Sequence, residues 1–327
     1  MAKEALVGVD LGGTNILAAV VDRKGRILGE SKCRTEPSLG AQGVTQRMAE
    51  TVLSAIKASG MRRKNIGGVG VGVPGPVHPD DGTVVRCANL GSTWDGYGLR
   101  DALREMVGLR ITVDNDVNVG ALGEHTYGAG RNAKDMLAIF VGTGIGGGLI
   151  LDGKLRSGFR NSAGEVGHMV ILADGPLCGC GGKGHAEALA SRTAIERNIR
   201  EALASGRESI VPQLMGDAGH AIMSASIIGD AFDAGDEVTR EAVQRAQYYL
   251  GVLISDCVNL LDPEVVVVGG GVLERMGDAY LEPVRSTAVE QFINRLDADK
   301  VRIVRAALGD YSGVIGAAIL ARERFGL

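Results

Sequence analysis

The stretch at residues 5–15 reads ALVGVDLGGTN. Its apolar residues 5–9 predict a strand, the polar glycine-rich segment after them predicts a tight turn, and apolar residues 16–21 predict a second strand. Next come a polar turn at residues 22–25 and a third predicted strand at residues 26–30. The chain therefore begins with three consecutive strands joined by turns, of which the first turn is rich in glycine.

The same pattern returns in the second half of the chain. Residues 136–141 are apolar, residues 142–148 read GTGIGGG, and residues 149–151 are apolar again. Asp152-Gly153 makes the next turn, and residues 154–156 begin another strand. A repeat this long is typical of a duplicated domain rather than of a solenoid.

The rest of the chain fits an α/β plan. Apolar runs predict strands at residues 66–73, 109–113 and 264–268, and helical spacing predicts helices at residues 43–59, 116–125, 186–205, 236–261 and 313–325. We expect a first lobe at residues 1–125, a larger second lobe at 126–310 and a returning helix at 311–327, with the hinge near 125–135.

Composition narrows the class of protein. A length of 327 residues suggests two domains, and a net charge of −4 with 4% aromatic residues disfavours nucleic acid as a partner. The apolar run at residues 5–9 is too short for a signal peptide, and none approaches the roughly 20 residues of a membrane helix. Five cysteines are too sparse for a disulfide scaffold. We expect a cytoplasmic protein with no membrane partner.

Two glycine turns can hold a polyphosphate, because backbone N–H groups approach oxygens closely only where no side chain intervenes. Thr14 and Thr143 would add hydroxyl donors. The alternative is that both turns are merely tight hairpins. Residues 142–147 also match the dinucleotide pattern G-x-G-x-x-G, but that fingerprint needs a following helix, and here a strand is expected.

Residues 168–187 contain four zinc-type ligands, namely His168, Cys178, Cys180 and His185. Zinc prefers four such ligands in a tetrahedron, and a complete set leaves no open position, so the pattern predicts a structural zinc site. The alternative is two incidental loop cysteines and two surface histidines. Cys33, Cys87 and Cys257 sit in apolar surroundings and are expected to pack as small buried residues.

Asp116 is a candidate general base. It follows an expected strand and opens an expected helix, so it can also be an ordinary helix N-cap. Glu165 and His168 lie in the glycine-flanked segment 164–168, and Glu187 lies nearby in sequence. Carboxylates and imidazoles of this kind recognise sugar hydroxyls, although each carboxylate alone can be a solvated surface group.

The order and spacing of these motifs resemble the ROK family of sugar kinases and related repressors, and within it most closely the bacterial-type ATP-dependent glucokinases. The resemblance runs from about residue 5 to the C-terminus. It rests on DLGGT at 10–14, PG at 74–75, ND at 115–116, the glycine turn at 142–148, GEVGH at 164–168, C-x-C-G-x-x-G at 178–184, LDPE at 261–264 with glycines 269–271, and residues 313–318. It implies a two-lobed actin-like, ribonuclease H-like ATPase fold, with duplicated α/β domains around a cleft.

The resemblance also implies a role for each matching residue. Asp116 would be the general base that activates a hexose hydroxyl, most favourably O6 of glucose, and His168 would bind zinc with one ring nitrogen while its other side faces the sugar. Asp10 would orient Mg²⁺ through water. The sugar would contact Asn89, Asn115, Asp116, Glu165, His168 and Glu187. ATP phosphates would lie at Gly12, Gly13, Thr14, Asn15, Thr143 and Gly144, and adenosine at Gly270 and Gly271. A dimer or tetramer is implied.

Two departures from the family pattern bear on these roles. His185 stands where the family usually has a third cysteine, so the zinc site carries one negative charge less. The loop GSTWDGYG at residues 91–98 differs on the expected sugar side. The alternative functions are a kinase for fructose, mannose or an N-acetylhexosamine, a sugar-sensing regulator and a nicotinamide dehydrogenase. Polyphosphate is the alternative phosphate donor. Repressors of the family carry an N-terminal helix-turn-helix, for which this sequence leaves no room before residue 5.

Overall fold

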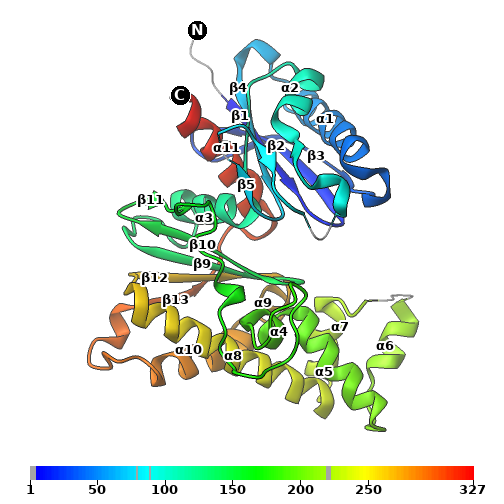
Figure 1. Cartoon of the computed structure of the whole chain (residues 1–327), viewed down its shortest axis with the longest axis vertical. Coiled ribbons are helices and arrows are strands. Elements are labelled where there is room, and N and C mark those ends of the chain that lie inside the picture. The colour runs from blue at the N-terminus through cyan, green and yellow to red at the C-terminus, as the bar shows by residue number, and fades with distance from the viewer. Residues whose placement is uncertain (1–4, 79, 88–89, 219–221) are drawn as a thin grey trace. The chain divides into compact units, whose positions relative to one another are not determined.

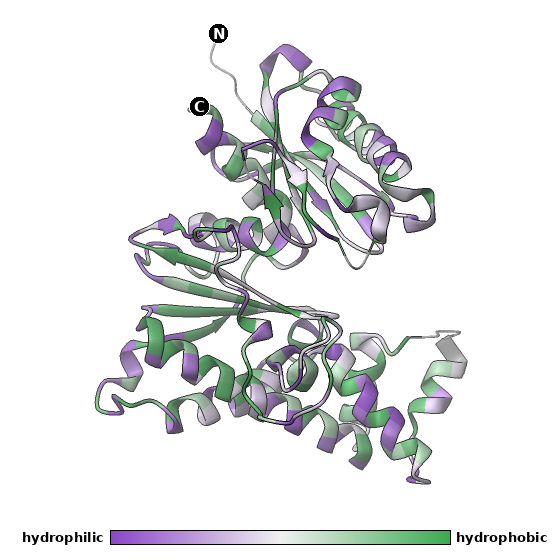
Figure 2. Ribbon diagram, viewed as in Figure 1, coloured by the Kyte–Doolittle hydropathy of each residue, from purple (hydrophilic) through white to green (hydrophobic). Residues whose placement is uncertain are grey.

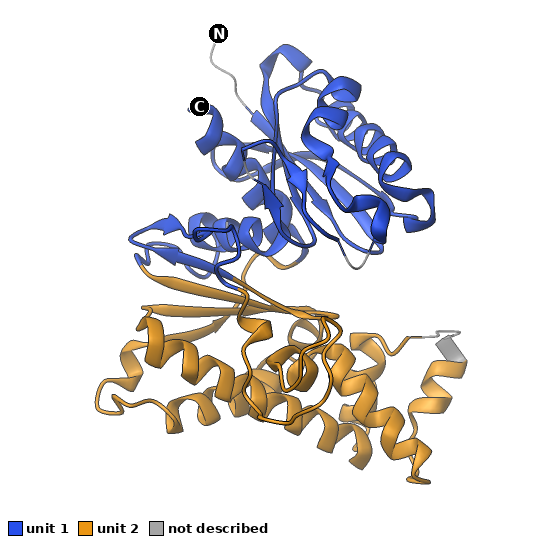
Figure 3. Ribbon diagram, in the orientation of Figure 1, with its two compact units in different colours: residues 1–134, 148–164, 310–327 blue, residues 135–147, 165–309 orange. Residues whose placement is uncertain are grey.

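A computed structural model describes residues 5–78, 80–87, 90–218 and 222–327. It divides into two compact units (Figure 3). Unit 1 comprises residues 1–134, 148–164 and 310–327, and unit 2 comprises residues 135–147 and 165–309. Among the described residues, none of the helices is both long and apolar enough to cross a bilayer.

Unit 1 contains a five-stranded sheet in the order β3-β2-β1-β4-β8 (Figure 1). β1 pairs antiparallel with β2 and parallel with β4, and β4 pairs parallel with β8. The strands are β1 (Ala5–Leu11), β2 (Asn15–Asp22), β3 (Ile27–Arg34), β4 (Ile66–Val73) and β8 (Ile111–Asn115). The three strands expected at the start of the chain are therefore confirmed.

Helices cover both faces of this sheet, as its apolar strands require. α1 (Gly40–Ala58) and α2 (Leu99–Val107) pack on the face that buries Val7 and Val9. α11 (Ser312–Phe325) packs on the opposite face, which buries Leu6, and it also contacts α3 (Asp116–Tyr127). α11 lies so close that a Cβ on Gly8 would come within 1.7 Å of the Val314 carbonyl oxygen. The absence of a side chain at Gly8 in the first strand therefore allows the closing helix to pack this close to the sheet.

A second five-stranded sheet repeats the order of the first, as β11-β10-β9-β12-β13. Its strands are β9 (Met136–Val141), β10 (Ile145–Leu151), β11 (Lys154–Leu155), β12 (Val265–Gly269) and β13 (Arg302–Arg305). In Figure 2 the strands of both sheets are coloured largely as hydrophobic. Because both sheets place an antiparallel hairpin before parallel strands, the duplication predicted from the two glycine turns is confirmed.

The helices of unit 2 are α4 (Ala186–Ala190), α5 (Arg192–Ala204), α6 (Val211–Ala218), α7 (Ala225–Asp233), α8 (Glu237–Leu261), α9 (Gly271–Met276) and α10 (Asp278–Glu290). The single helix predicted at residues 186–205 is wrong. Ser191 is extended, with φ −72° and ψ 165°, and its hydroxyl accepts a hydrogen bond from Ala194 N. This cap begins a new helix and ends α4.

Several other boundaries differ from the prediction. The last strand of the first sheet begins at Ile111 and ends at Asn115, two residues later than predicted at each end. β10 begins at Ile145, so Gly146, Gly147 and Gly148 lie in a strand rather than in the turn. A small sheet of β5 (Val77–His78), β6 (Thr83–Val84) and β7 (Tyr97–Gly98) was not predicted, because its strands have two residues each.

Candidate active site and metal cluster

The junction between β8 and α3 holds the predicted base. Asn115 is the helix N-cap, and its Oδ1 accepts hydrogen bonds from Val117 N at 2.9 Å and Asn118 N at 3.1 Å. Asp116 is the first helical residue, and its Oδ1 accepts from the same Val117 N at 2.9 Å. The interpretation of Asp116 as the cap is therefore corrected, because Asn115 performs it. A carboxylate in the first turn of a helix is stabilised in its ionised form by the helix dipole.

Asp10 lies in the same row of the first sheet as Asp114, the residue before Asn115. The strand register pairs Asp10 with Gly72 and Gly72 with Asp114. β1, β4 and β8 are parallel, so their carboxyl ends meet at one edge of the sheet. Ligands of open α/β sheets bind outside this edge. Unit 1 therefore gathers Asp10, Asn115 and Asp116 where a ligand is expected.

The Asp10 carboxyl is partly buried. Burial, followed by the negative charge of Asp310, raises the pKa of this carboxyl from 3.8 to about 6, against the opposing positive charge of Lys32. Asp310 lies one turn before α11, so the returning chain brings a second carboxylate toward the end of β1. A carboxylate in this environment gains from a cation beside it.

The first glycine turn connects β1 to β2. Gly12 N donates to Asn15 O at 2.9 Å, and Thr35, the residue after β3, closes the turn by donating from its Oγ1 to Gly12 O at 2.6 Å. Gly13 and Thr14 are exposed, and a Cβ on Gly13 would meet nothing within 4 Å. The turn therefore leaves open space for a ligand beside its backbone.

The second glycine turn connects β9 to β10 in unit 2. Gly142 N donates to Gly144 O at 2.9 Å, and Gly142 and Thr143 are exposed. Glu187 of α4 supports the turn, since its Oε2 accepts from Ile145 N at 3.0 Å. A Cβ on Gly144 would lie 2.1 Å from that oxygen, so a side chain at this position would displace the Glu187 carboxylate. The predicted phosphate-binding Gly144 and the predicted sugar-binding Glu187 are brought together.

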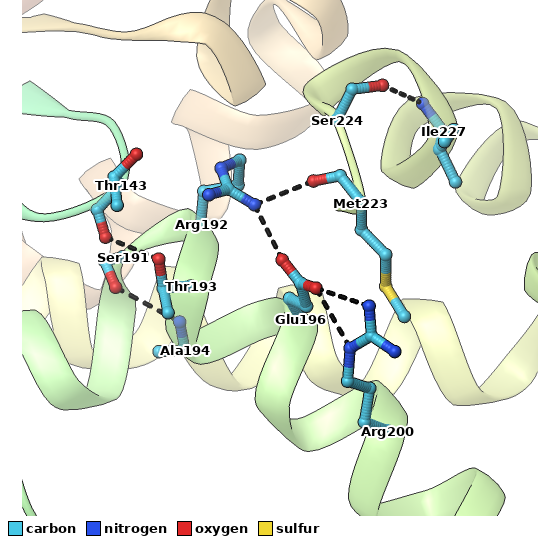
Figure 4. Close-up of polar contacts among 10 residues, drawn as sticks. All are labelled: Thr143, Ser191, Arg192, Thr193, Ala194, Glu196, Arg200, Met223, Ser224 and Ile227. Carbon is cyan, nitrogen blue, oxygen red and sulfur yellow. Dashed lines mark hydrogen bonds and ion pairs between the residues drawn. The ribbon is translucent and has the colours of Figure 1, made fainter. Parts of the chain in front are cut away.

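The start of α5 is attached to this turn (Figure 4). Thr193 Oγ1 donates to Thr143 O at 2.7 Å, and Arg192 N donates to Gly142 O at 3.0 Å. Arg192 Nη1 also contacts Glu196 Oε2 and Met223 O, both at 2.8 Å. The arginines on either side of Glu196 hold the pKa of its carboxyl below the ordinary value despite partial burial. Sequence reasoning missed this support, because Arg192 and Thr193 lie inside the helix that it predicted to be continuous.

The four predicted zinc ligands lie together in unit 2. One ligand atom from each of His168, Cys178, Cys180 and His185 can be chosen so that all lie within 4.8 Å of one another. Cys180 Sγ lies 3.2 Å from His185 Nδ1, and Cys178 Sγ lies 3.9 Å from His168 Nδ1. A sulfur–nitrogen edge of a zinc tetrahedron is about 3.5 Å, from bonds of about 2.3 and 2.0 Å. The cluster therefore has the ligand chemistry and nearly the dimensions of a zinc site.

Backbone turns shape this cluster. Cys178 N donates to Gly182 O at 2.7 Å and Gly181 N donates to Cys178 O at 2.9 Å, which closes a tight turn around Cys180. Cys178 is buried, and burial raises the pKa of its thiol to about 12. Its Sγ donates to Glu187 Oε1 at 3.3 Å. Glu187 thus joins the cysteine cluster to the second glycine turn.

His168 presents its two ring nitrogens to different groups. Nδ1 faces Cys178, whereas Nε2 lies 4.0 Å from Glu165 Oε2. The side chains of Glu165 and His168 are 46% and 37% exposed, so both remain accessible. One nitrogen therefore faces the cysteine of the cluster, and the other lies beside a predicted sugar-binding carboxylate.

A pocket of about 470 Å³ lies at the carboxyl ends of β12 and β13. Its lining comprises Val268, Gly269, Leu273, Glu274, Arg305, Ala306 and Ala307. Gly270 and Gly271, predicted to lie against adenosine, stand in sequence between the lining residues Gly269 and Leu273, at the start of α9. Asn89, the remaining predicted sugar-binding residue, lies outside the described residues.

Comparison with known proteins identifies the family. The sequence pattern of the ROK family matches residues 6–324. The chain belongs to the ROK family. It is 35% identical over 326 residues to a glucokinase of Halalkalibacterium halodurans, covering 99% of this chain and 97% of that protein. Another relative, a xylose repressor of Caldicellulosiruptor bescii, is 28% identical over 95% of this chain and 78% of the repressor.

A solved structure agrees with this assignment. The crystal structure of a ROK family glucokinase from Streptomyces griseus, in complex with glucose and AMPPNP, superposes with a TM-score of 0.85 at 35% identity. The match covers 98% of this chain and 99% of that one. The predicted actin-like α/β fold is confirmed.

Proposed function

We propose that this ROK protein is an ATP-dependent hexose kinase that converts glucose to glucose 6-phosphate. The observation that carries the proposal is the convergence of Asp10, Asn115 and Asp116 at one edge of the first sheet, beside the open first glycine turn. The 35% identity to a glucokinase over nearly the whole chain supports glucose as the acceptor.

In this proposal Asp116 accepts the proton of the attacking sugar hydroxyl. The cap formed by Asn115 fixes the start of α3 and hence the backbone that carries Asp116. Asn115, Glu165, His168 and Glu187 are proposed to hold the sugar, together with Asn89. Their amide, carboxylate and imidazole groups can pair with hydroxyls on several carbons at once.

The residues proposed to bind the phosphates of ATP are those of the two glycine turns, namely Gly12, Gly13, Thr14, Asn15, Thr143 and Gly144. Exposed backbone N–H groups and two threonine hydroxyls suit that task. The 470 Å³ pocket, next to Gly270 and Gly271, is the proposed place for the adenosine. Asp10 would hold Mg²⁺, which supplies charge neutralisation on the phosphates.

We propose that a structural zinc ion is bound by four side chains, those of His168, Cys178, Cys180 and His185. The ion would cross-link the segment 168–185. We expect purified protein to contain about one zinc per chain, and removal by a chelator to lower Tm by about 10 °C, since tight binding contributes about 4 kcal/mol. Cys178→Ser should lose the metal.

Cys33→Ser is the matched control, because Cys33 is a partly buried free cysteine of unit 1, remote in sequence from the cluster. Metal content by mass spectrometry and a melting curve check this prediction. Equal zinc in both variants would rule out the site.

Release of ADP from Mg·ATP against a panel of hexoses tests the function. Glucose should give the highest kcat/KM. A higher value for fructose, mannose or an N-acetylhexosamine would preserve the kinase and replace the acceptor, and residues 91–98 would then be examined for specificity. Trp94 in that loop is fully buried in the core of unit 1, so it acts there as an anchor.

The similarity to a xylose repressor favours one other candidate, a sugar-sensing regulator without catalysis. Sugar binding with no phosphorylation of any hexose would support that function and overturn ours. A polyphosphate donor would be revealed by turnover without ATP. We further propose a first lobe at residues 1–125, a second lobe at 126–310 and a returning helix at 311–327. We also propose that the protein is a homodimer or tetramer and that it is cytoplasmic.

A further inference from the structure

We propose that Arg324, near the C-terminus, is a positioning residue that acts through Asp114 to hold Asn115 and Asp116 in place. The inference rests on the proposed function, because Asp116 is the base in that proposal. It concerns contacts within unit 1 only.

Asp114 is a buried carboxylate whose oxygens are both occupied. Its side chain is 8% exposed. Oδ1 accepts from Asn115 N at 2.8 Å and from Asn118 Nδ2 at 2.9 Å, and Oδ2 accepts from Arg324 Nη2 at 2.5 Å. Buried charges require such pairing. Asp114 therefore joins the end of β8 to the first turn of α3.

Arg324 arrives from the last turn of α11, 210 residues away in sequence. Besides Asp114, it binds the end of β8 with its other terminal nitrogen. Nη1 donates to Thr112 Oγ1 at 2.9 Å and to Val113 O at 3.0 Å. The planar guanidinium thus spans three consecutive residues of β8, the last strand in the order of its sheet.

The bonds made by Asp114 lead directly to the proposed site. Asn118, held by Asp114, donates its backbone N–H to Asn115 Oδ1. Asn115 Nδ2 donates to Gly75 O at 3.2 Å, so the amide is fixed from two sides. Val117 N then bonds both Asn115 Oδ1 and Asp116 Oδ1. A rotation of Asp114 would disturb this whole set.

An ion pair at this place is weak evidence for a role in fold stability. A buried salt bridge contributes little net stability relative to packed apolar groups, whereas removing one partner leaves an uncompensated charge. Here the charge left behind would lie two residues before the proposed base. The arrangement therefore suits precise positioning, since a displacement of about 1 Å can cost about 10²-fold in rate.

Arg324→Met tests the inference, with Arg322→Met as the matched control. Arg322 lies in the same turn of α11, but it donates to Tyr127 Oη and Asp22 O, both at 3.2 Å, away from the junction. We expect Arg324→Met to lower kcat by about 10- to 100-fold with KM for ATP within about twofold. Arg322→Met should keep wild-type kcat, even where both variants lose the same Tm.

Two further variants separate positioning from folding. Arg324→Lys can keep the ion pair but not the bonds to Thr112 and Val113, so its kcat should fall between wild type and Arg324→Met. Adding Asp114→Asn to Arg324→Met removes the uncompensated charge, so the double variant should lose less than the product of the single losses. Equal kcat for folded Arg324→Met and Arg322→Met would overturn the inference, as would wild-type kcat in Arg324→Lys if Arg324→Met does not fold. Full activity of Asp116→Asn would instead exclude Asp116 as the base, and no phosphorylation of any hexose by the wild type would overturn the proposed function.

Discussion

Replacing Asp116 by Asn is expected to lower kcat by about 10²-fold or more, which is the usual contribution of a general base. Sugar binding should remain, because the amide keeps the size of the side chain and can still bond a hydroxyl. Stability should change little, since Asn115, and not Asp116, is the cap of α3. The measurement is steady-state ADP release, with glucose affinity measured separately by calorimetry.

Asp101→Asn is the control for this substitution. Asp101 also lies in the first turn of a helix of unit 1, and its side chain is 52% exposed. Its replacement should leave kcat unchanged. Wild-type turnover in Asp116→Asn would exclude Asp116 as the base, and loss of glucose binding together with turnover would assign it to binding alone.

The sequence was most informative where glycine and polar residues interrupt apolar runs. The two glycine turns predicted the duplication, because a repeated pattern of strand, turn and strand is visible without any tertiary contact. The cluster of His168, Cys178, Cys180 and His185 was predicted for a similar reason. Its members lie within eighteen residues, so local turns are enough to bring them together.

Features that depend on distant contacts could not be predicted. Arg324 and Asp114 are 210 residues apart, and no local pattern connects them. The break at Ser191 was missed because helical residues flank it on both sides, whereas the contacts of Arg192 and Thr193 with the second glycine turn fix where α5 begins. The start of β10 at Ile145 has the same cause, since Glu187 binds Ile145 N.

Asp10→Asn is the second substitution with a large expected effect, and it should lower activity while it raises stability. We expect kcat to fall by about 10²-fold or more, because Asp10 is the proposed Mg²⁺-orienting carboxylate and charge neutralisation on the phosphates is a main term in phosphoryl transfer. At pH 7.5 the variant should nevertheless resist urea better than the wild type. Burial and Asp310 make the ionised carboxylate unfavourable in the folded chain, and the amide removes that charge.

The pH dependence gives this prediction its sign. The pKa of Asp10 is about 6 in the folded chain and 3.8 as an ordinary value, so the folded state binds the proton more tightly. The stability that this proton contributes is fully present below 3.8 and is lost as pH rises through about 6. The rise in the pKa of Asp10 corresponds to at most about 3 kcal/mol of folding stability.

The advantage of Asp10→Asn over the wild type should therefore be largest at pH 7.5 and should shrink as pH falls toward 5. Urea midpoints at several pH values check this, with the exposed Asp299→Asn as a control expected within about 0.5 kcal/mol of wild type. Mg·ATP should narrow the difference at pH 7.5, because a cation beside Asp10 relieves the unfavourable charge only where the carboxylate is present. A variant that is less stable than wild type at pH 7.5, or that keeps full turnover, would contradict the role of Asp10.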